Sequence, residues 1–167
     1  MEKKKNVVRY KNLQFKWTSE KGLLLKGCNG YLLRYFGGKD LILVKNQVFI
    51  VTRSAYFVFL KNLISCFSGV LSGYFLELTF VGLGYRFLKL NNYILIKVGQ
   101  SHYAKFFIPN NIQVMGYKKR LIFFGLSMVT VKRLVFFVRC LRQPDIYKGK
   151  GILYFGEKVI LKVGKQK

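Results

Sequence analysis

The hydrophobic pattern of the first fifty residues is that of short strands. Apolar runs at 23–26 and 31–36 flank Asn29-Gly30, a dipeptide that favours a hairpin because both residues accept positive φ. Two further runs, 41–44 and 48–51, predict a second hairpin.

The period then changes to steps of three and four residues. Over 55–72 the apolar side chains share one face and the polar ones share the other, which predicts an amphipathic helix. This segment is also the best candidate for a membrane span. A span needs about twenty mainly apolar residues, whereas Lys61 and Asn62 lie near the middle of this helix. We therefore interpret it as a packed helix that is not integral to a membrane.

The strand pattern returns after Gly73. It predicts six runs, over residues 75–81, 85–90, 93–98, 102–108, 112–115 and 121–124. A second helix should begin at Ser127, which is a good N-cap, and stop before Pro144. Its inner stripe consists of Val131, Leu134, Val135, Val138 and Leu141.

This order of hairpins, helix, hairpins and helix predicts an α+β protein of two similar small domains. Each is expected to be an antiparallel sheet packed with one helix. Residues 1–73 would form an N-terminal domain that begins with a basic arm over 1–13, and residues 74–167 a C-terminal domain that ends in a basic tail. A chain of 167 residues can supply modest cores for two such units.

Charge narrows the class of partner. Thirty Lys and Arg stand against six Asp and Glu, a net charge of +24, and such a surface repels itself unless a polyanion neutralises it. Because 51% of the residues are hydrophobic, the chain is not a disordered basic tail. Nucleic acid is the leading partner, and an anionic membrane surface is the second.

Cysteine usage indicates the compartment. Cys28, Cys66 and Cys140 are far apart, with no pair at metal-ligand spacing. We expect reduced, buried thiols, hence a reducing compartment, and neither a metal nor another cofactor. The N-terminus does not read as a secretory signal.

One stretch, 144–154, combines charge with backbone freedom. Two lysines alternate with two glycines between two tyrosines: Tyr147, Lys148, Gly149, Lys150, Gly151 and Tyr154. Glycine lets the main chain turn and come close to another surface, and lysine brings a compact positive charge. This suits folded RNA, on which phosphate contacts fix register and orientation. The plainer alternative is a solvated turn that follows a helix.

Residues 144–152 resemble the signature of a known family, the large-subunit ribosomal protein numbered six in its bacterial and organellar form. Residues 81–86 are similar to its Val-Gly-x-Gly-Tyr-Arg segment, residues 99–102 to its Gly-x-Ser-His turn, and residues 26–30 to its Lys-Gly-x-x-Gly hairpin. The chain departs from the family in three places. The family's basic, proline-containing start is not recognisable over residues 7–17, Leu153 replaces a usual basic residue, and the helix at 55–72 is far more apolar than usual.

The resemblance implies two copies of a small α+β domain that bind large-subunit ribosomal RNA near the sarcin-ricin loop. Neighbouring large-subunit ribosomal proteins and, nearby, translational GTPases would be its partners. It also implies a structural and assembly role without catalysis and without a small-molecule substrate.

Two other classes remain open: a cationic membrane-associated protein and a free RNA-binding module that stacks bases on aromatic rings. Catalysis we reject, because His102 is the only histidine and the six acidic residues are scattered without an evident acid–base pair.

We expect Lys148 and Lys150 to meet phosphates, while Gly149 and Gly151 let the main chain come close. The side chains expected to flank them are Arg139, Arg142, Tyr147, Tyr154, Lys158 and Lys162. A possible second RNA patch consists of Lys118, Lys119 and Arg120. The same residues are equally consistent with a solvated turn. Recognition would rest on shape and charge, since A-form RNA hides its base edges in a deep groove.

For a protein that resembles a ribosomal family, the composition indicates a mitochondrial location. The chain is rich in Phe, Tyr, Ile, Leu, Lys and Asn and has two alanines, Ala55 and Ala104, which we interpret as the mark of an AT-rich coding genome. A mitochondrion-encoded protein fits this composition, and a plastid or an AT-rich bacterium is the alternative.

Overall fold

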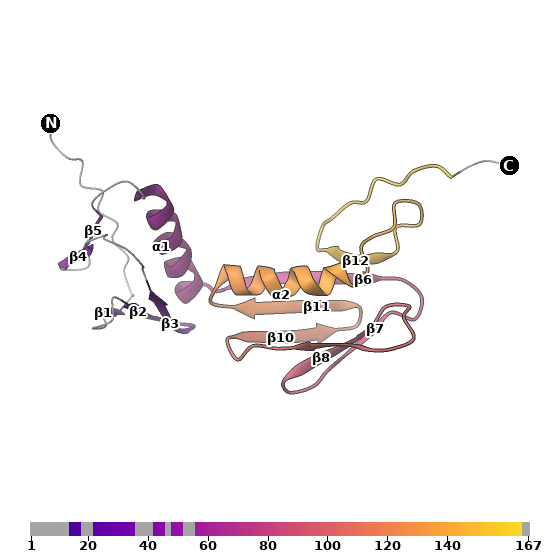
Figure 1. Cartoon of the computed structure of the whole chain (residues 1–167), viewed down its shortest axis with the longest axis horizontal. Coiled ribbons are helices and arrows are strands. Elements are labelled where there is room, and N and C mark those ends of the chain that lie inside the picture. The colour runs from indigo at the N-terminus through magenta and orange to yellow at the C-terminus, as the bar shows by residue number, and fades with distance from the viewer. Residues whose placement is uncertain (1–13, 18–21, 36–41, 46–47, 52–55, 165–167) are drawn as a thin grey trace. The chain divides into compact units, whose positions relative to one another are not determined.

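A computed structural model describes residues 14–17, 22–35, 42–45, 48–51 and 56–164 of the chain. The chain forms two compact units, Met1–Gly73 and Tyr74–Lys167, and Figure 1 labels most of their elements. The predicted arm over 1–13, the first residue of the second hairpin and its turn, and the expected helix start at Ala55 lie outside the described residues.

The N-terminal unit contains five strands and one helix among the described residues. Its elements are β1 (Gln14–Trp17), β2 (Gly22–Gly27), β3 (Gly30–Tyr35), β4 (Ile42–Lys45), β5 (Val48–Val51) and α1 (Tyr56–Leu71). The first three strands form an antiparallel sheet in the order β1-β2-β3, and β4 pairs with β5. Both predicted hairpins are therefore confirmed. Gly27 pairs with Gly30, so the turn of the first hairpin is Cys28-Asn29. Strand β1 was not predicted, because its order comes from pairing along its whole length with β2.

Helix α1 is amphipathic, as predicted. Leu63, Phe67 and Val70 are buried, whereas Lys61 and Asn62 are exposed. The helix contacts β2 and β3, and Leu23 and Leu25 of β2 are fully buried. Within the described part of the chain, none of the helices has the length and apolar character needed to cross a bilayer.

The C-terminal unit contains seven strands and one helix among the described residues. They are β6 (Tyr74–Val81), β7 (Arg86–Lys89), β8 (Tyr93–Lys97), β9 (Ala104–Phe107), β10 (Ile112–Tyr117), β11 (Arg120–Gly125), α2 (Met128–Cys140) and β12 (Gly151–Tyr154). One antiparallel sheet has the order β10-β11-β6-β12 and a second has the order β7-β8-β9. Helix α2 packs against β6 and β11, and β7 contacts β10 (Figure 1).

One apolar cluster unites these elements. Leu78 and Phe123 of the larger sheet, Ile96 of the smaller sheet and Val135 of α2 all belong to it and are almost completely buried. Alternation places the remaining side chains of each strand on the outer faces of the sheets. The predicted α+β class, with antiparallel sheets and two helices, is confirmed.

The second helix also agrees with prediction. Ser127 is its N-cap residue, although its side chain makes no capping hydrogen bond, and four of the five predicted inner residues are buried. Two details differ. Arg120 lies in β11 and not in the turn before it, and residues 151–154, for which no strand was predicted, form β12.

The cysteines correct one expectation. All three are free thiols, but Cys28 and Cys140 are exposed and only Cys66 is buried. Burial raises the pKa of the Cys66 thiol, and the Arg34 guanidinium opposes this only in part. The exposed pair escaped prediction because apolar neighbours in sequence do not show which side of an element faces the core.

Native alkylation should separate the three thiols. We expect iodoacetamide at neutral pH to modify Cys28 and Cys140 in the folded chain, and Cys66 much more slowly, because only the exposed thiolate reacts. Mass spectrometry of peptides sampled over time measures the three rates, and urea should abolish the difference. Equal rates in the absence of urea would contradict the burial of Cys66.

Candidate nucleic-acid interface

The segment between α2 and β12 is a closed loop. At its base the Ile152 amide donates to the Arg142 carbonyl at 3.0 Å. Further in, the Asp145 amide donates to the Lys150 carbonyl at 2.9 Å, and the Gly149 amide donates to the Asp145 carbonyl at 2.8 Å. These hydrogen bonds bring the two ends of the loop together, so the basic residues between them occupy a defined shape.

Asp145 organises the tip of this loop. One of its carboxylate oxygens accepts from the Tyr147 amide at 3.2 Å, and the other accepts from the Lys148 amide at 3.3 Å. An aspartate that accepts main-chain amides two and three residues ahead stabilises a turn. Sequence reasoning did not assign this role to Asp145, although Pro followed by Asp is common in turns.

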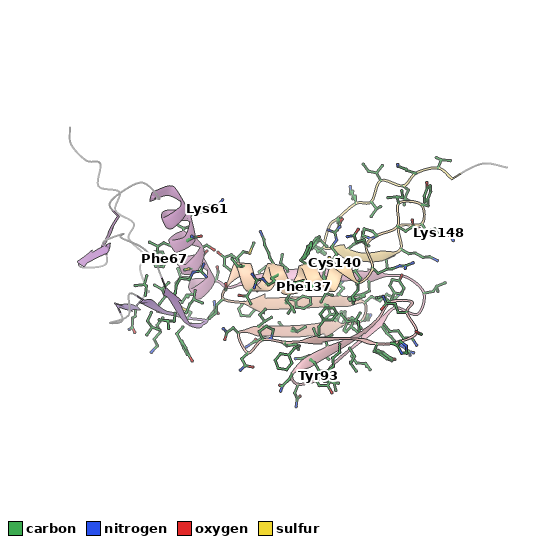
Figure 2. The ribbon with its side chains drawn as sticks, in the orientation of Figure 1. Lys61, Phe67, Tyr93, Phe137, Cys140 and Lys148 are labelled. Atoms are coloured by element: carbon green, nitrogen blue, oxygen red, sulfur yellow. The ribbon has the colours of Figure 1, made fainter. Side chains whose placement is uncertain are left out.

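The two signature lysines project from that turn. Lys148 and Lys150 are exposed, and among the described residues neither forms an ion pair. Gly149, between them, has φ of +66°, in the left-handed region that favours glycine. Tyr147 beside them is more than half exposed. Figure 2 shows Lys148 on this loop, on the side of the unit opposite to Tyr93. The loop thus presents two free ammonium groups and one aromatic ring.

The C-terminal tail crosses the same loop. The Lys162 amide donates to the Ile146 carbonyl at 2.9 Å, and a Leu161 methyl carbon would lie 3.4 Å from a Cβ added at Gly149. The main chain at Lys162 is therefore held next to the loop, and the Lys162 side chain is exposed. Arg142, at the base of the loop, and Lys158, on the tail, are exposed as well.

Gly151 requires a correction. It is buried, and a Cβ at this position would lie 2.6 Å from Pro144 Cα and 2.8 Å from the Gln143 carbonyl oxygen. The missing side chain makes room for the chain's own backbone, so Gly151 does not let the main chain approach an RNA. Its contribution is to close the base of the loop.

Arg139 and Tyr154 also make contacts within the C-terminal unit, with each other and with Glu157. The Arg139 guanidinium is 2.5 Å from Glu157 Oε1 and lies 4.6 Å from the centroid of the half-buried Tyr154 ring. The other oxygen of Glu157 accepts from the Tyr154 amide at 3.0 Å. This arrangement fixes the end of α2 to the end of β12. This pair was not predicted, because Glu157 lies 18 positions from Arg139 in the chain.

The second predicted patch lies at the same end of the larger sheet. Tyr117 pairs with Arg120, so Lys118 and Lys119 form the tip of the β10–β11 hairpin. The Phe80 amide donates to the Lys119 carbonyl at 2.8 Å, and Phe80 pairs in turn with Ile152 of β12. The hairpin tip therefore lies beside β6, which pairs on its other edge with β12, the strand that follows the loop.

Within this patch, Lys118 and Lys119 form no ion pair with any described residue, and the Lys118 ammonium lies 5.4 Å from the centroid of the Tyr117 ring. The Nε atom of Arg120 is 3.5 Å from Glu77 Oε1, and this ion pair neutralises part of the positive charge of Arg120. In the part of the chain that the structure describes, no three His, Cys, Asp or Glu side chains come together as metal ligands. The site offers cations and an aromatic ring, which is the chemistry of phosphate and nucleotide binding.

The known proteins that are similar to this chain include mitochondrial and bacterial members of one ribosomal protein family. Large ribosomal subunit protein uL6m of Prototheca wickerhamii is 34% identical over 113 residues, which cover 60% of this chain and 58% of the relative. The uL6m protein of Reclinomonas americana is 36% identical over 100 residues, covering 59% and 54%. Bacterial uL6 of Thermotoga petrophila is 31% identical over 115 residues, covering 68% and 61%.

The chain thus spans less than two thirds of the length of these curated relatives. No protein-family profile matches it. Over the aligned part, the similarity to large-subunit ribosomal protein six is confirmed.

Proposed function

We propose that this chain is a structural component of the large ribosomal subunit, a relative of uL6 that binds large-subunit ribosomal RNA and has no catalysis of its own. The observation that carries the proposal is the closed, Asp145-organised loop, which holds Lys148 and Lys150 exposed and unpaired. The names of the similar proteins support the same assignment.

The interface acts through charge and shape. Lys148, Lys150 and Lys162 contact phosphates around the loop, and Arg142 and Lys158 flank them. Lys118 and Lys119 extend the contact along the same end of the sheet. Arg139, Gly151 and Tyr154 support this surface from within. Because the deep groove of A-form RNA conceals its base edges, the fixed geometry of the loop gives selectivity for a folded site.

The finer placement is part of the proposal. The chain binds near the sarcin-ricin loop, beside neighbouring large-subunit proteins and close to where translational GTPases dock. It works in a mitochondrial ribosome, in keeping with its similarity to uL6m proteins. Its similarity to bacterial uL6 makes a plastid or a bacterial cytoplasm the alternative location.

The loop lysines provide the test. We expect Lys148→Ala with Lys150→Ala to lower the slope of log affinity against log salt by roughly 1.5, since each phosphate contact contributes about 0.7–0.9. The measurement is a salt titration of the full chain binding to a transcript of bacterial large-subunit rRNA. The matched control is Lys132→Ala with Arg133→Ala, which removes two exposed charges from α2.

We call Lys148→Ala with Lys150→Ala the loop pair, and Lys132→Ala with Arg133→Ala the control pair. If both pairs and the unmodified chain had the same salt slope, the loop lysines would not contact RNA. Sedimentation decides between the classes of protein. The proposed ribosomal component stays with large subunits at moderate salt, whereas a free RNA-binding module dissociates and an integral membrane protein remains in a carbonate-washed membrane pellet.

A further inference from the structure

The small sheet β7-β8-β9 carries a second basic surface, on the face turned away from the core. Ile94 and Ile96 of β8 point into the apolar cluster, and strand alternation places their neighbours on the opposite face. That outer face brings together Arg86 of β7, Lys97 of β8 and Lys105 of β9. We call it the outer sheet face.

The cations on this face repel one another. Arg86 is directly opposite Lys97 in the β7–β8 ladder. Like charges in a directly opposed cross-strand pair are destabilising. The C-terminal unit contains three carboxylates, Glu77, Asp145 and Glu157, and none of them belongs to this sheet. No acidic side chain on this sheet therefore compensates the repulsion between Arg86 and Lys97. An anionic ligand bound there would supply the missing negative charge.

Aromatic rings hold the lysines in place. The Lys105 ammonium lies 4.1 Å from the centroid of the Tyr93 ring, and the Lys97 ammonium lies 5.5 Å from the centroid of the Tyr103 ring. A cation over an aromatic face is attracted by the ring quadrupole. Less side-chain freedom is then lost when the ammonium binds a ligand. The sheet thus offers cations that are ordered before binding.

Apolar surface lies between the charges. Leu88 is 53% exposed and Phe107 is 67% exposed, and both alternate onto the outer sheet face. Cations interspersed with exposed rings are typical of surfaces that bind phosphates and pack against riboses or bases. In Figure 2, Tyr93 lies on this sheet, away from α2 with its Phe137 and Cys140, and away from Lys148.

We propose that the outer sheet face is a second RNA-binding site, separate from the loop at Lys148. Arg86, Lys97 and Lys105 bind the phosphates of one RNA segment, and Leu88 and Phe107 pack against its riboses or unstacked bases. The proposal rests on the chain's being an RNA-binding protein, as proposed above. It gives the C-terminal unit two separate RNA contacts, so that a folded RNA would hold the unit from two sides.

The test compares two pairs of substitutions in the full chain. We expect Lys97→Gln with Lys105→Gln to lower the salt slope of binding to a bacterial large-subunit rRNA transcript by roughly 1.5, and to add to the loop pair for a total of roughly 3. The charge-conserving pair Lys97→Arg with Lys105→Arg should keep the original slope. Lys132→Gln with Arg133→Gln is again the control for charge loss elsewhere.

The results separate the two proposals. If the loop pair lowers the slope and the sheet pair behaves as the α2 control does, the second site is refuted and the loop site stands; if neither lowers it, both fall. Ultraviolet cross-linking of the unsubstituted chain gives a readout that does not depend on how well a variant folds. RNA should be attached to the peptides that contain Tyr93, Tyr103 or Phe107, and its absence from all of them overturns the proposal.

Two other ligands are distinguished by the same variants. Vesicles with 30% phosphatidylserine test a lipid surface, and polyglutamate tests an acidic protein. Binding of either one that depends on Lys97 and Lys105, with RNA binding unaffected by them, would assign the outer sheet face to that ligand and reject RNA.

Discussion

Gly151→Ala should destabilise the C-terminal unit by about 3 kcal/mol, the largest effect that we expect of a single methyl group in this chain. The added Cβ would lie 2.6 Å from Pro144 Cα and 2.8 Å from both Pro144 N and the Gln143 carbonyl oxygen. All three atoms belong to the backbone, so no side chain can rotate away. Overpacking of this kind costs about 1–3 kcal/mol, and the φ of +157° lies in a region occupied almost only by glycine, which adds about 1 kcal/mol for a residue with a Cβ.

Hydrogen exchange measured by mass spectrometry locates the effect. In Gly151→Ala the Ile152 amide, which donates to the Arg142 carbonyl, should exchange much faster, together with the rest of β12. The matched control is Gly156→Ala. Gly156 also has positive φ, +77°, but a Cβ there meets no atom within 4 Å. We expect the control to lose only about 1 kcal/mol, and equal losses in the two variants would contradict the steric explanation.

Glu157→Ala should cost about 2–3 kcal/mol, because Glu157 satisfies two groups at once. Its carboxylate pairs with the Arg139 guanidinium at 2.5 Å and accepts the Tyr154 amide at 3.0 Å. Side chains of both partners in the pair are 27% exposed, and the Arg139 Nε atom is buried with no hydrogen-bond partner among the described residues. Removing the carboxylate leaves a partly buried cation and an amide unsatisfied, and hydrogen bonds to charged groups contribute about 1.5–3 kcal/mol.

A double-mutant cycle with Arg139→Ala measures this coupling from urea unfolding. We expect about 1–2 kcal/mol of interaction energy. Glu77→Ala serves as the control, because its ion pair with Arg120 is longer, 3.5 Å, and the Arg120 side chain is 57% exposed. The Glu77 side chain is 18% exposed, but its long contact with a largely solvated guanidinium should contribute only about 0–1 kcal/mol. A coupling near zero between Arg139 and Glu157 would refute the role that we assign to the pair.

The Arg139→Ala variant also distinguishes a supporting role of Arg139 within the unit from direct contact with RNA. Arg139→Ala should leave the salt slope of RNA binding unchanged at temperatures where the variant is folded, because its charge is already paired. A fall of roughly 0.7–0.9, the value for one lost phosphate contact, would show that Arg139 itself binds the RNA.

Local pattern predicted most of the elements correctly. Helices α1 and α2 each carry a stripe of apolar residues at helical spacing, and the buried side chains Leu63, Phe67, Val131 and Val135 follow it. Turn residues such as Cys28-Asn29 separate the paired strands of hairpins. Elements that lack such local signals were missed. Strands β1 and β12 are both short, and each is ordered by a neighbouring strand.

The sequence alone determined the chemistry of this protein: its large positive charge, its apolar periodicity, and a lysine–glycine signature that resembles a ribosomal protein family. Tertiary structure decided which of those residues are free to act. It buried Gly151 against Pro144, paired Arg139 with Glu157, and left Lys148 and Lys150 exposed. It also gathered Arg86, Lys97 and Lys105 on one face. The physical reason is that charge and periodicity are properties of neighbours in sequence, whereas burial, ion pairing and convergence depend on residues that only the fold brings together.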